Sequence, residues 1–226
     1  MSLTLVIFDV DGTLVDSQAQ ITASMQGAFV AEGLKPPSRA AVLTIVGLSL
    51  PQAIAQLAPG QGAATVARLV EGYKDHYTHL RANDPQAGGS PLFPGAREAL
   101  ERLAQRDEVL LGVATGKSRR GLTHVIETHD LAHFFLTTQV ADDHPSKPHP
   151  SMIQACMAAT GAEAARTVMV GDTSFDMEMG RAAGVRCLGV DWGYHPRVQL
   201  QAAGAERILD DFAALDAALD EMWEIA

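Results

Sequence analysis

The fold is decided by one stretch of the chain, Leu5-Val6-Ile7-Phe8-Asp9-Val10-Asp11-Gly12-Thr13-Leu14. The apolar run from Leu3 to Phe8 has the length and the β-branched content of a fully buried strand. Two carboxylates follow at Asp9 and Asp11, and open α/β sheets place their chemistry at this end of a strand. Such close carboxylates repel each other unless a cation or a proton lies between them. An acidic turn is the alternative interpretation, but acids placed directly after an apolar strand favour a catalytic site.

The rest of the chain divides into a helical part and a part in which strands and helices alternate. From Ser17, which we expect to cap the first helix, to about Asn83 the apolar spacing is helical only. A linker rich in Pro and Gly runs from Asn83 to Gly95. Beyond it, helices alternate with predicted strands over Val109–Ala114, Phe134–Thr138, Thr167–Val170, Val185–Val190 and Arg207–Leu209.

Repeated strand–helix units predict an α/β fold with a doubly wound parallel sheet, that is, a Rossmann-like core. The helical part is then an insertion after the first strand. We expect residues 1–15 and 90–226 to form the core, and residues 16–89 to form an all-helical cap domain with its hinge linkers.

Composition narrows the range of partners. The 226-residue chain has a net charge of −10 and no block of Lys or Arg. This argues against nucleic acid and anionic membranes, but not against a small anionic substrate. Cys156 and Cys187 lie in apolar sequence without CxxC spacing, which predicts buried thiols in a reducing compartment. Because the chain shows no basic leader, cleavage site or membrane-spanning run, we expect a cytoplasmic protein. We expect it to be either a monomer or a homodimer.

Two later segments carry groups suited to a phosphate. Thr115 and Gly116 follow a predicted strand and precede a helix, so a hydroxyl and free backbone N–H groups meet there, although Ser118 could simply cap the helix. Lys147 lies in a proline-rich loop that restricts the backbone and aims the ammonium, although a surface lysine in a turn fits the loop alone equally well. The same loop contains four possible metal ligands, Asp142, Asp143, His144 and His149. Their spacing fits no standard metal site.

A third segment repeats the opening pattern. An apolar strand ends in Gly171-Asp172, and a second acid, Asp176, follows four residues later. Asp172 and Asp176 could converge with Asp9 on one hard cation, and oxygen-only ligation of that kind suits Mg²⁺. Taken alone, the segment is better explained as an N-cap aspartate with a second acid that the helix dipole favours.

Together these motifs resemble a known family. Asp-x-Asp-Gly-Thr at residues 9–13, Thr115-Gly116, Lys147-Pro148 and Gly171-Asp172-x-x-x-Asp176 follow one another at strand ends in this order. The chain therefore resembles the haloacid dehalogenase-like superfamily, in its phosphatase branch with a helical cap after the first strand. Within that branch it is most similar to phosphoglycolate phosphatases, on the basis of residues 9–17 and the overall layout.

The resemblance implies a role for each motif in hydrolysing the phosphate monoester of a small metabolite. Asp9 would attack phosphorus and become an aspartyl-phosphate, while Asp11 would protonate the leaving alcohol and then activate water. Mg²⁺ would be held by the Asp9 carboxylate, the Asp11 carbonyl and Asp172, with Asp176 acting through water or as a hydrogen-bond partner of the ligands. The phosphoryl oxygens would be bound by Thr115, Lys147 and backbone N–H groups near Val10, Asp11 and Gly116.

Two further expectations concern the cap and the proton on Asp11. The turn Gly47-Leu48-Ser49-Leu50 is expected to contact substrate, because a glycine-containing turn can approach a ligand closely. Asp11 must start protonated beside a divalent cation, so we expect a hydrogen bond from the hinge region to hold that proton.

Four alternatives are weighed against a phosphatase. A true haloacid dehalogenase needs neither Asp11 nor Mg²⁺. A sugar phosphomutase of the β-phosphoglucomutase type shares all the motifs and differs in its cap residues. A phosphonate hydrolase would need a reactive cap lysine, and Lys35 and Lys74 are poorly placed for that role. A receiver-like binding switch must preserve its aspartyl-phosphate, which Asp11 would destroy.

Overall fold

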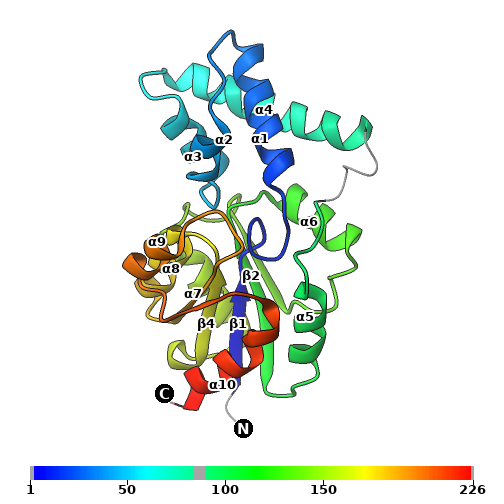
Figure 1. Ribbon diagram of the computed structural model, residues 1–226, viewed down its shortest axis with the longest axis vertical. Coiled ribbons are helices and arrows are strands. Elements are labelled where there is room, and N and C mark those ends of the chain that lie inside the picture. The colour runs from blue at the N-terminus through cyan, green and yellow to red at the C-terminus, as the bar shows by residue number, and fades with distance from the viewer. Residues whose placement is uncertain (1–2, 84–89, 225–226) are drawn as a thin grey trace.

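The computed structural model describes residues 3–83 and 90–224 and contains a six-stranded parallel sheet in the order β3-β2-β1-β4-β5-β6 (Figure 1). This order places β1 between β2 and β4, so that the order reverses at the centre of the sheet, where doubly wound folds bind their ligands. The strands are β1 (Thr4–Phe8), β2 (Val109–Thr115), β3 (Thr137–Val140), β4 (Thr167–Gly171), β5 (Arg186–Val190) and β6 (Arg207–Leu209).

Alternate residues of β1 bury against opposite faces of the sheet. Val6 and Phe8 belong to one apolar cluster, with side chains from α5 (Ala96–Ala104), α6 (Arg119–Thr128) and α10 (Leu215–Glu224). Leu5 and Ile7 belong to a second cluster on the other face, with side chains from α7 (Ser151–Thr160) and α8 (Ser174–Ala183). A strand covered by helices on both faces needs apolar side chains on both, which explains the unbroken apolar run from Leu5 to Phe8. The remaining short elements are η1 (Ala164–Arg166), α9 (Arg197–Ala203) and η2 (Phe212–Ala214).

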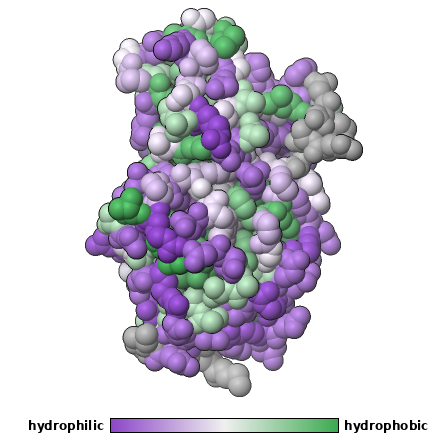
Figure 2. Space-filling model, in the orientation of Figure 1, coloured by the Kyte–Doolittle hydropathy of each residue, from purple (hydrophilic) through white to green (hydrophobic). Residues whose placement is uncertain are grey.

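Four helices lie together at one end of the molecule, beyond the end of the sheet at which β1 stops (Figure 1). They are α1 (Gln18–Ala31), α2 (Arg39–Leu43), α3 (Leu50–Leu57) and α4 (Ala63–Asn83). Their buried side chains form an apolar cluster of their own, which includes Met25, Ile54 and Leu69. In space-filling form the molecule narrows between this helical block and the sheet (Figure 2).

The two connections to the helical block are paired with each other. The Asp16 N–H donates to the carbonyl oxygen of Pro91 at 2.8 Å, and the Phe93 N–H donates to that of Leu14 at 2.9 Å. Val15 and Leu92 form an antiparallel bridge between these two bonds. The block is therefore joined to the sheet through one short two-stranded connection.

The predicted fold class, a doubly wound parallel sheet with a helical insertion, is confirmed. The predicted strand over Phe134–Thr138 was placed too early, because Phe134 closes a turn and buries its ring in the core, so that β3 begins only at Thr137. The predicted linker from Asn83 to Gly95 lies partly outside the described residues, which resume at Ser90. In the described part of the chain, helices of the length and apolar character needed to cross a membrane are absent.

Candidate active site

The turn after β1 brings two acids to the carboxyl end of the sheet. Asp9 is 1% exposed and Asp11 is 8% exposed. Gly12 has a φ of 88°, which L side chains rarely adopt, and a Cβ at this position would lie 2.2 Å from an oxygen of Asp172. The turn therefore requires glycine for its conformation and for the close approach of the Asp172 carboxylate.

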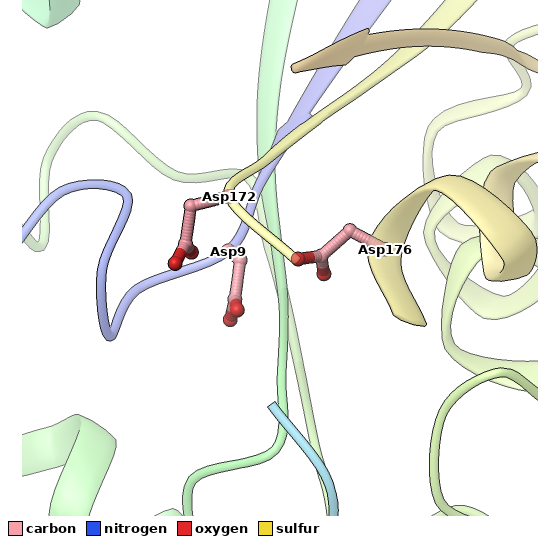
Figure 3. Close-up of side chains that lie close together, drawn as sticks. All are labelled: Asp9, Asp172 and Asp176. Carbon is pink, nitrogen blue, oxygen red and sulfur yellow. The ribbon is translucent and has the colours of Figure 1, made fainter. Parts of the chain in front are cut away.

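Three buried aspartates converge at this end of the sheet. Asp9, Asp172 and Asp176 each offer a carboxylate oxygen within 4.8 Å of the other two (Figure 3). Burial raises the pKa of Asp9 to about 6, with Lys147 lowering it and Asp176 raising it further. Burial, and then the charges of Asp176 and Asp9, also raise the pKa of Asp172 well above its usual range. Such a cluster needs positive charge between its members.

Asp172 is fixed by two donors from distant parts of the chain. The Thr13 hydroxyl donates to Oδ1 at 2.9 Å, and the backbone N–H of Tyr194 donates to Oδ2 at 2.9 Å. Gly193 lets the second segment come this close, because a Cβ there would lie 2.1 Å from the Asp172 side chain. The carboxylate is thus oriented before any ligand binds.

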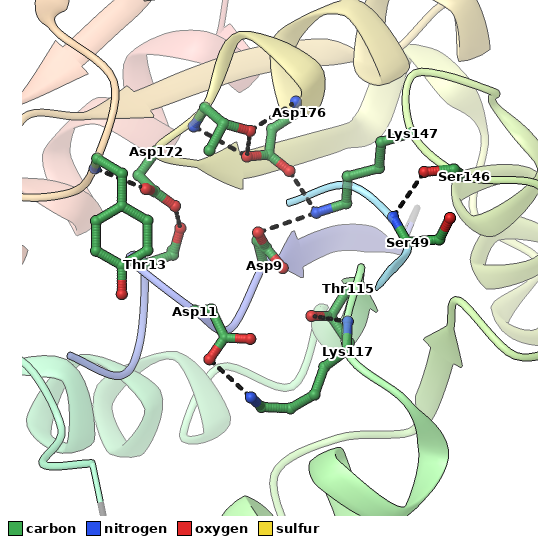
Figure 4. Close-up of polar contacts among 12 residues, drawn as sticks. Asp9, Asp11, Thr13, Ser49, Thr115, Lys117, Ser146, Lys147, Asp172 and Asp176 are labelled. Carbon is green, nitrogen blue, oxygen red and sulfur yellow. Dashed lines mark hydrogen bonds and ion pairs between the residues drawn. The ribbon is translucent and has the colours of Figure 1, made fainter. Parts of the chain in front are cut away.

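Asp176 is already satisfied by protein donors. Its Oδ1 accepts from the Lys147 ammonium at 2.6 Å, and its Oδ2 accepts from the Thr173 hydroxyl and the Thr173 N–H in a capping box. Lys147 is fully buried and also lies 3.0 Å from Asp9 (Figure 4). Although burial disfavours its charge, Asp176 and Asp9 outweigh that effect and raise the pKa of Lys147. The proline-rich loop therefore aims Lys147 between two carboxylates.

The donor set fits Mg²⁺. All three converging groups are carboxylates, which are the hard oxygen ligands that this ion prefers. Asp9 Oδ1 is buried and, within residues 3–83 and 90–224, accepts no hydrogen bond. Because both oxygens of Asp176 are occupied by Lys147 and Thr173, Asp176 is better suited to supporting the ligands than to direct coordination.

Backbone donors surround the same point. Thr115 ends β2 with 1% exposure, and its hydroxyl oxygen accepts from the Lys117 N–H at 3.2 Å. In the part of the chain that the structure describes, the amides of Val10, Asp11 and Gly116 donate no hydrogen bond within the protein. These three N–H groups are therefore available to an anion, as the sequence-based assignment of a phosphate site requires.

A turn of the helical block closes over the sheet at this point. Gly47 has a φ of 100°, and a Cβ added to Gly116 would lie 2.3 Å from the Gly47 carbonyl oxygen. The Ser49 N–H donates to the Ser146 hydroxyl oxygen at 2.7 Å, which ties the turn to the Lys147 loop (Figure 4). The turn Gly47–Leu50 thus rests directly on the site.

Between the turn, the helical block and the sheet lies a cavity of about 570 Å³, which we call the chamber. Asp9, Asp11 and Thr115 line its floor, and Gly47 lines it from the turn. Its wall toward the helical block is mostly apolar and includes Ile21, Met25, Leu48, Val70, Tyr73 and Tyr77. The chamber can accordingly hold an organic group attached to a phosphate bound at Asp9.

The family follows from comparison with known proteins. A family model described as haloacid dehalogenase-like hydrolase matches residues 6–190, most of the chain. The chain is a haloacid dehalogenase-like hydrolase. The family expected from the motifs is thereby confirmed.

Relatives of this hydrolase are found over nearly its whole length. A probable phosphatase, IndB, from Dickeya dadantii (strain 3937) is 37% identical over 212 residues, covering 92% of this chain and 90% of its own. A phosphoglycolate phosphatase from Rhodospirillum rubrum is 35% identical over 220 residues, covering 93% and 88%. The crystal structure of a hydrolase from Pseudomonas syringae superposes with a TM-score of 0.84 at 27% identity, covering 96% and 98%.

The haloacid dehalogenase-like hydrolase also has site residues that the sequence reasoning missed. The Lys117 ammonium lies 2.8 Å from Asp11 Oδ1, whereas we expected a hinge-region hydrogen bond to this carboxyl. Tyr194 contacts the hinge at Ser17, whose N–H and hydroxyl lie 3.2 and 3.1 Å from the Tyr194 oxygen. Ser17 therefore precedes α1 as expected, but its hydroxyl binds Tyr194 and does not cap the helix. The only signal for Lys117 was its place two residues after Thr115.

The acids and histidines of the Lys147 loop do not form a cluster of the kind weighed from the sequence. Asp143 pairs with the Arg119 guanidinium at 2.5 Å, and Asp142 accepts from the Arg119 N–H at 2.8 Å. His144 contacts the side chains of Gln139 and Ser151. Among described residues, the carboxylates of Asp9, Asp172 and Asp176 are the one group arranged to hold a metal ion.

Proposed function

We propose that this haloacid dehalogenase-like hydrolase is a Mg²⁺-dependent phosphatase that cleaves small phosphate monoesters through an aspartyl-phosphate on Asp9. The observation that carries the proposal is the buried convergence of Asp9, Asp172 and Asp176 around the Lys147 ammonium at the ends of β1 and β4. A carboxylate poised to attack and a fixed cation beside it match the needs of phosphoryl transfer, which depends on positioning and charge neutralisation.

The relatives support the phosphatase class. Two of them, at 37% and 35% identity over nine-tenths of the chain, are a probable phosphatase and a phosphoglycolate phosphatase. Phosphoglycolate, a phosphate ester of a two-carbon hydroxy acid, is therefore the first substrate to test. We take residues 16–89 as the cap domain that covers it and residues 1–15 and 90–226 as the catalytic core.

Asp9 is the nucleophile in this mechanism. Its carboxylate would attack phosphorus as the ester oxygen leaves, and water would later cleave the resulting acyl phosphate. The Lys147 ammonium and the N–H groups of Val10 and Gly116 would stabilise the charge on the transferring oxygens. Because Lys147 is held by Asp176 at 2.6 Å, it is already oriented for this contact.

Mg²⁺ would be held by the carboxylates of Asp9 and Asp172 and by the backbone carbonyl of Asp11, with Asp176 supporting the ligands. When bound, the ion supplies charge neutralisation at the phosphoryl group. The hydrogen bonds from Thr13 and Tyr194 keep the Asp172 carboxylate in place for it.

Asp11 would act on the other side of the transferred group. Its side chain is 11% exposed and lines the chamber, where the leaving alcohol would lie. It would give a proton to that alcohol and then take one from the water that cleaves the aspartyl-phosphate. A receiver-like switch has no use for such a group or for a chamber.

The test is phosphate release from p-nitrophenyl phosphate with and without Mg²⁺. Asp9→Asn should lower kcat/KM by at least about 1,000-fold, the scale on which loss of a catalytic nucleophile is felt. Asp210→Asn, at an exposed aspartate far from the site, is the matched control. Activity that survives in Asp9→Asn would refute the nucleophile assignment, and isomerisation of a sugar phosphate without hydrolysis would establish a mutase.

A further inference from the structure

The chamber wall holds a buried cation to which the mechanism gives no task. Lys117 follows the Thr115-Gly116 pair, and its side chain is 8% exposed although it lies on a loop. Its ammonium lies 2.8 Å from Asp11 Oδ1 and 5.5 Å from the centre of the Tyr77 ring of α4. Lys117 is thus placed where the core, the helical block and the proton-transfer group meet (Figure 4).

The other charged groups of the site do not duplicate Lys117. Lys147 is engaged by Asp9 and Asp176, on the side of the phosphoryl group. Among the described residues that line the chamber, the other cations are Lys74, Arg81 and Arg120. The Lys74 side chain is 53% exposed and pairs with Glu71 at 2.7 Å, Arg120 is exposed, and Arg81 lies over the Tyr77 ring. Of these cations, Lys117 is the one that contacts Asp11, and its side chain is largely shielded from water, where charge pairing is strong.

The position of Asp11 fixes which part of a substrate Lys117 reaches. On the proposed function, Asp11 protonates the ester oxygen of the leaving alcohol. An ammonium 2.8 Å from the Asp11 carboxylate then lies beside the first carbon atoms of that alcohol. A lysine has three N–H donors, so Lys117 can bind Asp11 and a further acceptor together.

We propose that Lys117 is a specificity-determining residue that binds a second anionic group on the leaving alcohol, such as the carboxylate of a phosphorylated hydroxy acid. This inference rests on the proposed function and deepens it. In the free enzyme the Asp11 carboxyl group is the partner of Lys117. When Asp11 carries the proton that it gives to the alcohol, the carboxylate of the substrate is the counter-ion of Lys117. Neutral alcohols of equal size leave the ammonium without this partner and are hydrolysed less efficiently.

The test compares 2-phosphoglycolate with ethyl phosphate, which shares the ester and the two-carbon chain but lacks the carboxylate. Wild-type enzyme should prefer 2-phosphoglycolate in kcat/KM. Lys117→Met should lower kcat/KM for 2-phosphoglycolate about 10- to 100-fold more than for ethyl phosphate, the loss expected for one hydrogen bond to a charged group. Lys117→Arg should keep part of the preference, and Lys35→Met, at an exposed lysine outside the chamber, should keep all of it.

Two results would overturn the inference: a wild-type enzyme without preference, or equal losses on both substrates in Lys117→Met, which would mean that Lys117 only positions Asp11. If Lys117→Met fails to fold, inhibition of the wild type decides. 3-Phosphonopropionate should inhibit more strongly than propylphosphonate, and equal inhibition would refute the carboxylate site. Ethyl phosphate tests the proposed function separately, because its hydrolysis does not depend on a substrate carboxylate. Asp9→Asn should abolish that hydrolysis.

Discussion

Adding one methyl group at Gly116 should separate catalysis from folding. In Gly116→Ala the new Cβ would lie 2.3 Å from the Gly47 carbonyl oxygen and 2.8 Å from that of Leu48. Both obstacles are backbone, so they cannot rotate away as a flexible side chain would. The shortest contact must lengthen to at least 3.0 Å, a displacement of at least about 0.7 Å between the turn and the sheet.

A shift of this size acts at the point where the turn rests on the amides that we propose to bind phosphate. Misplacement of catalytic groups by about 1 Å can cost about 100-fold in rate. We therefore expect Gly116→Ala to lower kcat/KM for p-nitrophenyl phosphate by about 10- to 100-fold. The melting temperature should change by only a few degrees, because the turn belongs to the apolar cluster of the helical block through Leu48 and can shift together with that block.

The assay measures initial rates at saturating Mg²⁺ beside thermal unfolding of the same preparations. Gly62→Ala is the matched control, because a Cβ at this glycine of the helical block would meet no atom within 4 Å. Wild-type kcat/KM in Gly116→Ala would refute the contact between the turn and Gly116 in the working enzyme. Unfolding of the variant at assay temperature would refute the claim that the contact serves the site alone.

Four further predictions follow from the polar contacts. Burial raises the pKa of Asp9 to about 6 against the lowering effect of Lys147, so a proton competes with Mg²⁺ for this carboxylate. Calorimetry should therefore show an affinity for Mg²⁺ about tenfold weaker at pH 5 than at pH 7. Equal affinity at the two pH values would refute the assignment of Asp9 as a ligand. For the same reason the metal-free protein should lose stability as pH rises from about 4 through 6, because the folded state holds this proton more tightly than the unfolded chain. Asp172→Asn should raise the melting temperature of the metal-free protein, because it removes a like charge from the buried aspartate cluster. The same variant should no longer be stabilised by Mg²⁺. A lower metal-free melting temperature would argue against repulsion between the aspartates. Tyr194→Phe should lower the free energy of unfolding in urea by about 1 kcal/mol, because the contact with Ser17 is lost. The affinity for Mg²⁺ should stay unchanged, because it is the backbone amide of Tyr194 that holds Asp172. Weaker Mg²⁺ binding would contradict these separate roles of the side chain and the backbone.

Local patterns were sufficient to predict the sheet. Strand β1 is buried on both faces, so its sequence is apolar at each position from Leu5 to Phe8, and β6 was predicted with its observed bounds. Strand β3 was misplaced because Phe134 and Phe135 resemble a strand, although Phe134 closes a turn through its N–H bond to Leu131 and buries its ring in the core. Burial alone does not distinguish a strand from a well-packed turn.

Contacts between distant loops could not be predicted in the same way. Asp9 and Asp172 could be grouped because each ends an apolar strand, and neighbouring parallel strands end at one edge. Lys117 and Tyr194 lie in loops whose paths depend on tertiary packing, and nothing in the residues beside them indicates their partners. A single sequence therefore identifies the chemical groups of these residues, but it does not indicate which groups lie within contact distance in the folded protein.

Charge balance connects the metal, the substrate and the fold. Four aspartates and two lysines meet at the site: Asp9, Asp11, Asp172, Asp176, Lys117 and Lys147. With all six ionised the site has a net charge of −2, which would repel a phosphate monoester, and this charge is part of what raises the pKa values of Asp9 and Asp172. One divalent cation brings the sum to zero. We therefore expect Mg²⁺ to bind before the substrate, with the free amides and Lys147 then receiving an anion that the metal-free site would reject.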